Sequence, residues 1–98
     1  MGVPEVRGPA KGGEVIALVF HSLPLIATQE TKIVWRVTGH GPLRVTGTNE
    51  AGDAAQVSGP SSHVGGDWDT FVIFPKPGCW RVHVQRDDVT GDVFLPVR

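Results

Sequence analysis

The sequence predicts an all-β protein, an antiparallel β-sandwich of about seven strands. Short runs rich in β-branched and aromatic residues recur along the 98 residues, and Gly, Pro, Asn or Asp separates them. Apolar and polar residues alternate in several runs, as in strands with one buried and one wet face. No segment free of glycine and proline keeps a helical period of apolar residues.

The strands follow in chain order from these runs. EVIALVFH and TKIVWRVT open the series, LRVTGT follows, and AAQVS is the weakest candidate. DTFVIF is rich in β-branched and aromatic residues, and CWRVHVQR alternates clearly. DVFLPV contains a proline, which favours an edge or an interrupted strand because proline lacks the N–H of a ladder hydrogen bond. The predicted strands cover residues 14–21, 31–38, 43–48, 54–58, 69–74, 79–86 and 92–97.

Alternation in the second and sixth runs predicts which of their residues lie in the core. Trp35 and Val37 share one face of the second run, and Trp80, Val82 and Val84 share one face of the sixth. The large indole rings make these residues the centre of the predicted packing.

The chain length fits one small domain, which we assign to residues 14–98. Residues 1–13 contain a short strand candidate, VPEVRG, and then the flexible PAKGG, so we expect an N-terminal extension or an added edge strand. The segment SLPLIATQE carries Leu23, Leu25 and Ile26, which either cover one end of the core or form a contact patch.

Charge and hydropathy disfavour several classes of function. The formal net charge is −1 and the basic residues are scattered, which disfavours a nucleic-acid surface. The longest apolar run, VIALVF, is far shorter than the roughly 20 residues that span a membrane. No secretory leader opens the chain, and this fits either a cytoplasmic start or a start placed on a mature secreted domain.

Cys79 is the only cysteine, so no disulfide can form within the chain. We expect a small, half-buried residue at the entry to a strand. Intermolecular pairing, metal binding and a catalytic thiol are the alternatives, and the last needs a base and an electropositive setting.

The stretch PKPGCW predicts a tight corner before the sixth strand, because Pro77-Gly78 is a turn signal. It resembles the corner before that strand in immunoglobulin-like domains, where a Gly-x-Tyr stands in the place of Gly78, Cys79 and Trp80. The resemblance implies an immunoglobulin-like sandwich. Trp80 lacks the hydroxyl that usually bonds to the backbone there, and Val82 replaces the second disulfide cysteine of antibody domains.

KIVWRVTGHGPLRV, GPSSHVGGDW and FPKPGCWRVHV together resemble small bacterial immunoglobulin-like domains of unassigned activity that are often exported. The resemblance covers about residues 32–97. It implies the fold and an extracytoplasmic location, secreted or at the cell surface, and it carries over no catalytic residue.

Three polar loops are expected at one end of the sandwich, because consecutive strands alternate in direction. The connection between the fourth and fifth strands is long for a hairpin, as functional loops often are. Trp68 in it is either an anchor folded onto the core or an exposed ring that stacks on a sugar. The candidate ligand-binding residues on these loops are His40, His63, Asp67, Trp68, Asp87 and Asp88.

The loops lack the spacing of known catalytic or metal motifs. No two histidines form H-x-H or H-x3-H pairs for zinc, and DDVTGD lacks the residue order of an EF-hand. No nucleophile elbow, dinucleotide fingerprint or Walker sequence is present. We therefore expect no enzyme activity, no cofactor and no metal.

The sequence favours a non-catalytic binding or protein-interaction module. Its expected partner is an unknown protein or a polysaccharide, with the chain a monomer or a weak homo-oligomer. One alternative is a carbohydrate-binding module that uses the loop around Trp68. The other is a metal-binding protein that uses the loop histidines and aspartates.

Overall fold

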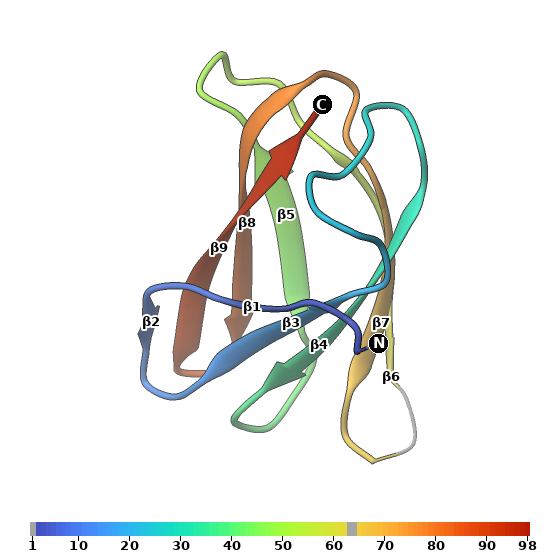
Figure 1. Ribbon diagram of the computed structural model, residues 1–98. Coiled ribbons are helices and arrows are strands. Elements are labelled where there is room, and N and C mark those ends of the chain that lie inside the picture. The colour runs from blue at the N-terminus through green and yellow to red at the C-terminus, as the bar shows by residue number, and fades with distance from the viewer. Residues whose placement is uncertain (1, 63–64) are drawn as a thin grey trace.

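The computed structural model describes residues 2–62 and 65–98, and it consists of two antiparallel β-sheets packed face to face (Figure 1). Sheet A has the spatial order β1-β3-β4-β7-β6. Sheet B has the order β2-β9-β8-β5. The bounds are β1 (Glu5–Arg7), β2 (Ala10–Lys11), β3 (Val15–Val19), β4 (Thr31–Val37), β5 (Arg44–Thr48), β6 (Gln56–Ser62), β7 (Trp68–Ile73), β8 (Gly78–Arg86) and β9 (Val89–Val97).

The predicted fold class is confirmed, but the described residues form nine strands rather than about seven. The two additional strands come from the N-terminal segment. β1 extends sheet A beside β3, and β2 extends sheet B beside β9. β1 lies within VPEVRG, the short strand candidate of this segment, whereas β2 lies within PAKGG, which was expected to be flexible. With only two residues, β2 is too short for a period of two to appear in the sequence.

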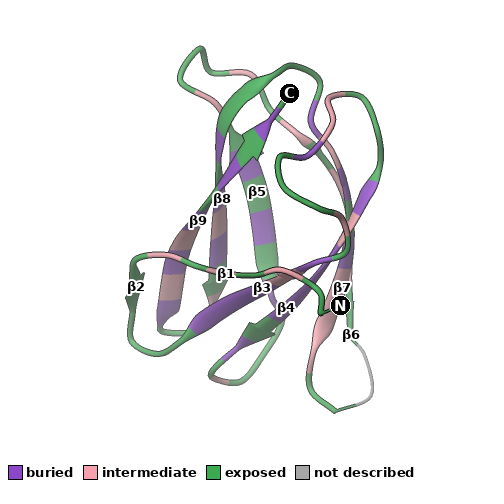
Figure 2. Ribbon diagram, viewed as in Figure 1, coloured by how far each residue is buried: buried purple, intermediate pink, exposed green. Residues whose placement is uncertain are grey.

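The core lies between the two sheets, and buried and exposed residues alternate along β5 and β8 (Figure 2). Trp35, Val37, Trp80, Val82 and Val84 all lie in it, with at most 5% of their surface exposed. No disulfide joins the two sheets, since the chain has a single cysteine. Dispersion and the removal of apolar surface from water therefore hold them together.

Two consecutive buried side-chain hydrogen bonds link β4 and β7 within this core. The indole Nε1–H of Trp35 donates to the hydroxyl of Thr70 at 3.0 Å, and that hydroxyl donates to the carbonyl of Ile33 at 2.8 Å. Both polar groups are therefore satisfied without water, which removes the cost of burying them.

The corner before β8 is closed by a hydrogen bond from the indole of Trp80 to the backbone. The Nε1–H of Trp80 donates to the carbonyl of Lys76 at 2.9 Å, and the ring lies 5.4 Å from that of Phe74. Gly78 has φ = 136°, a conformation that favours glycine. The indole thus joins the backbone of this corner to the core.

The segment between β3 and β4 contains both a residue that covers the core and a residue that is exposed at the surface. Leu25 is fully buried and closes one end of the core. Its N–H donates to the carbonyl of Pro96 at 2.9 Å, and its carbonyl accepts from the N–H of Arg98 at 2.8 Å. Pro96 therefore continues β9 without interruption, since its missing N–H lies on the side away from β8. Leu23 is exposed.

Candidate functional site

The connections β4–β5 and β8–β9 and the described part of β6–β7 emerge at the same end of the sandwich, as expected from strand parity (Figure 1). The structure describes five of the six candidate residues, and all five lie at this loop end. His63, the sixth, lies outside the described residues.

His40 and Asp87 come together at an open hollow of about 490 Å³. Gly41, Pro42, Arg44 and Gln85 complete its lining, whereas Asp88 is not part of it. The lining residues are all exposed. The hollow therefore presents a guanidinium, a carboxylate and an imidazole to water.

Trp68 is an anchor of the loop end. The residue is half-buried and packs against the core. The guanidinium carbon of Arg86 lies 5.6 Å from the ring centroid, which is cation–π distance. A sugar would have to displace this contact to stack on the face that Arg86 covers.

Arg86 organises the loop end, although it is not among the predicted site residues. Its Nε–H donates to the carbonyl of Gly41 at 2.9 Å, and its Nη1–H donates to the carbonyl of Val37 at 2.7 Å. The sequence does contain a signal that Arg86 points inward. Arg86 continues the alternation of the inward residues Trp80, Val82 and Val84 to the end of β8.

Asp67 belongs to a salt bridge on sheet A. Arg36 donates to both of its carboxylate oxygens at 3.0 Å through Nε–H and Nη2–H. This bond raises the pKa of the Arg36 guanidinium above its ordinary value. Among the described residues, no group of three or more His, Cys, Asp or Glu side chains is arranged to hold a metal ion.

Asp92 gathers two partners on the outer face of sheet B. Burial opposes its ionisation, but the Nε–H of Arg81 at 2.9 Å and the Nδ1 of His83 at 2.8 Å bind the carboxylate. The two partners outweigh burial and hold the pKa of Asp92 below its ordinary value of 3.8.

Cys79 lies on the same outer face and is exposed, so the expectation of a half-buried residue is wrong. The physical reason is alternation: Trp80 points inward, and its neighbour in the strand therefore points to solvent. Phe94 and Arg81 lie beside Cys79 in a shallow hollow of about 250 Å³.

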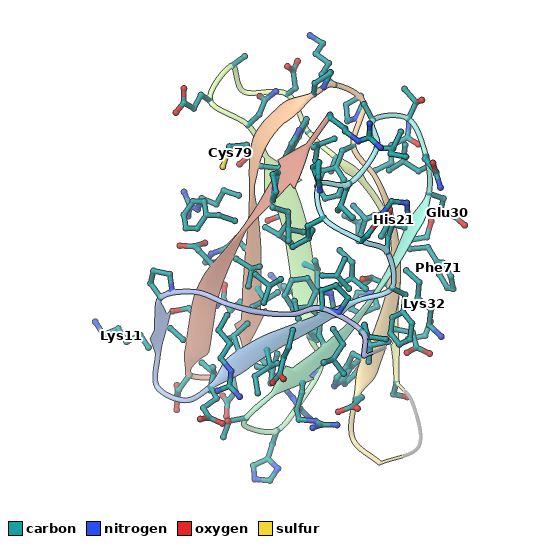
Figure 3. The ribbon with its side chains drawn as sticks, viewed as in Figure 1. Lys11, His21, Glu30, Lys32, Phe71 and Cys79 are labelled. Carbon is teal, nitrogen blue, oxygen red and sulfur yellow. The ribbon has the colours of Figure 1, made fainter. Side chains whose placement is uncertain are left out.

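A second surface contains exposed apolar side chains on and beside sheet A. Its residues Lys32 and Phe71 lie on the opposite side of the molecule from Cys79 (Figure 3). Val3, Phe20 and Leu23 line one hollow of about 460 Å³. The ammonium of Lys32 lies 5.1 Å from the Phe20 ring centroid, and Lys32 is paired across the strands with Phe71. We refer to these five residues as the Phe20 patch.

Composition alone does not reveal this patch. Phe20 and Phe71 are 47% and 41% exposed, although each occurs in a run whose composition predicts a strand. Phe71 lies in β7, and Phe20 follows directly after β3. Their exposure follows from register, because both lie on the outward side of sheet A, opposite the side that faces the core.

No family model matches the chain, and no curated protein matches it by sequence. Among solved structures, the crystal structure of the Lin-41 filamin domain superposes with a TM-score of 0.68. The alignment covers 94% of this chain and 97% of that chain at 10% sequence identity. At this identity the likeness shows the fold alone, an immunoglobulin-like β-sandwich like that of a filamin domain. No described helix is long and apolar enough to cross a membrane.

Proposed function

We propose that this domain is a non-catalytic protein-interaction module that binds its partner through the Phe20 patch. One observation carries the proposal. The exposed large hydrophobic residues of the described chain are Val3, Phe20, Leu23, Phe71 and Phe94, and all except Phe94 belong to the patch.

Such clustering is typical of interaction surfaces. Single exposed apolar residues are ordinary, but contiguous ones mark sites that another molecule covers. Aromatic side chains dominate the energetics of such sites, because they bury a large area with few rotatable bonds. The filamin-like fold supports the same role by analogy of fold only.

The loop end supports a different and weaker candidate, a polar ligand such as a polysaccharide. The hollow beside His40, Arg44, Gln85 and Asp87 has the donors and acceptors that hydroxyl groups need. Such binding would not use the face of Trp68 that Arg86 covers.

The extracytoplasmic location stays a prediction.

Affinity capture with matched variants tests the main proposal. Phe20→Ser and Phe71→Ser remove patch aromatics, and Phe94→Ser removes an aromatic of similar exposure on the other sheet. We expect the two patch variants to lose most of the captured partner, while Phe94→Ser retains it. Equal capture by all three folded variants would contradict the proposal. Thermal shift with oligosaccharides, compared between the wild type and Asp87→Ala, tests the loop end.

A further inference from the structure

We propose that the Phe20 patch binds a second copy of this chain, in a two-fold arrangement that sets Glu30 of each copy opposite the partner's Lys32. This inference rests on the proposed function and names the partner of the same surface. It is argued from the order of charges along β4 and from the strand register of sheet A.

The outward positions along the line of β4 alternate as Glu30, Lys32, Val34 and Arg36. Figure 3 shows Glu30, Lys32 and Phe71 along the same side of the molecule. On the neighbouring β7, Phe71 lies beside Lys32, and Ile73 is the next outward residue, level with Glu30. These two outward rows thus pair a charged residue on the line of β4 with an apolar residue of β7, whereas the next outward row pairs Val34 with Asp69.

Glu30 and Lys32 are the charges of this surface that await a partner. Neither forms an ion pair with another residue in the part of the chain that the structure describes, and the ammonium of Lys32 lies 5.1 Å from the centroid of the Phe20 ring. Arg36, in contrast, is already bound to Asp67. Covering an ammonium without a carboxylate is costly, so whatever covers the patch must bring an acidic group to Lys32.

A second copy can supply that group for only some positions of the two-fold axis. We consider an axis that lies in the interface and runs across the strands. If it passes at Lys32, the two ammonium groups face one another; if it passes at Val34, Lys32 faces the partner's Arg36. Midway between Lys32 and Val34, it sets Lys32 against an apolar side chain. Midway between Glu30 and Lys32, it places opposite charges together twice.

An axis along the strands is also unfavourable. It would set Lys32 against the partner's Phe71 and Glu30 against the partner's Ile73, so the carboxylate would be covered by an apolar side chain. The axis between Glu30 and Lys32 instead sets Phe71 against the partner's Ile73. Apolar and charged contacts are then satisfied together, which is the self-complementarity that a two-fold interface requires.

The size of the surface predicts a weak dimer. With the axis between Glu30 and Lys32, two outward rows about 6.8 Å apart meet the partner's same rows, and over five strands about 4.8 Å apart they cover a footprint of roughly 300 Å². A standard interface buries roughly 800 Å² on each partner. We therefore expect a weak, concentration-dependent dimer rather than a permanent one.

Sedimentation equilibrium from about 1 µM to about 1 mM tests the inference, with Lys32→Glu, Glu30→Lys and the double exchange Glu30→Lys/Lys32→Glu. Each single variant places like charges together twice, and we expect it to raise Kd at least about tenfold. The double exchange restores opposite charges, and we expect it to recover a Kd within about threefold of the wild type. Circular dichroism verifies that each variant is folded.

The contradicting results are distinct. A wild type that stays monomeric throughout, or a double exchange that does not recover dimerisation, overturns the second-copy inference. If a monomeric wild type still captures another protein, and Phe71→Ser abolishes that capture, the proposed function stands without this inference. If a dimer forms that neither Phe71→Ser nor the charge variants weaken, and capture is equally unaffected, both fail.

Discussion

Replacing Trp80 by phenylalanine tests how the corner before β8 stabilises the fold. The substitution keeps an aromatic ring in the core but removes the Nε1–H that donates to the carbonyl of Lys76. The residue is fully buried and lies against Phe74. Two losses therefore combine, a hydrogen bond and part of the packing volume.

The magnitude follows from these two losses. A partly buried carbonyl left without its donor costs about 1–2 kcal/mol. A ring deficit of roughly 40 Å³, at about 24 cal/mol per Å³ of cavity, adds about 1 kcal/mol. The sum of about 2–3 kcal/mol corresponds to a fall in Tm of roughly 8–24 °C for a domain of this length.

Urea denaturation and calorimetry measure this loss, and Cys79→Ser is the matched control. Cys79 is the adjacent residue but is exposed, so its replacement by serine should change the free energy of unfolding by less than about 0.5 kcal/mol. Equal stabilities of Trp80→Phe and Cys79→Ser would refute the structural role assigned to the indole.

Three further predictions concern other contacts. Thr70→Val leaves the buried Nε1–H of Trp35 without an acceptor, and urea denaturation should find a loss of about 1–3 kcal/mol; a neutral result would contradict these buried hydrogen bonds. Arg86→Ala uncovers Trp68, so acrylamide quenching of tryptophan fluorescence should increase, and unchanged quenching would argue against the stacked guanidinium. The lowered pKa of Asp92 gives stability that is present above pH 3.8 and lost as pH falls through the lower folded-state pKa. Asp92→Asn should therefore flatten this acid limb of the stability curve, and an unchanged limb would remove Asp92 as its source.

The fold was predictable from the sequence because its longer strands alternate. The faces of Trp35 and Trp80 followed directly from a period of two. The pairing of β1 with β3 could not be predicted in this way. β1 has only three residues, and Val6 reaches the core only once β1 is aligned with β3 in the folded sheet. The exposure of Cys79 was predictable from the same alternation, but its small apolar character suggested burial instead.

The candidate site was predicted less well, because side-chain contacts between distant strands decide it. Strand parity brought His40 and Asp87 to one hollow, as polar residues on neighbouring loops should be. The pairing of Asp67 with Arg36 spans 31 residues, and no local pattern reports such a contact. The Phe20 patch likewise depends on the register between β4 and β7, which sets Lys32 beside Phe71.

The charge order of sheet A also explains why its exposed apolar face does not imply indiscriminate association. Lys32 lies beside Phe20 and Phe71, and a partner without an acidic group would cover an uncompensated ammonium. In the proposed interaction, the lysine disfavours purely apolar partners while the aromatic rings provide the contact area. Specificity of this kind depends on a repulsive element as well as an attractive one.

The most direct test of the interaction surface is residue-resolved NMR of the labelled domain, recorded with increasing protein concentration and with any captured partner. The account predicts that the largest amide shift changes occur around Phe20, Lys32 and Phe71 on sheet A. Changes concentrated at His40 and Asp87, or on the outer face of sheet B around Phe94, would contradict it.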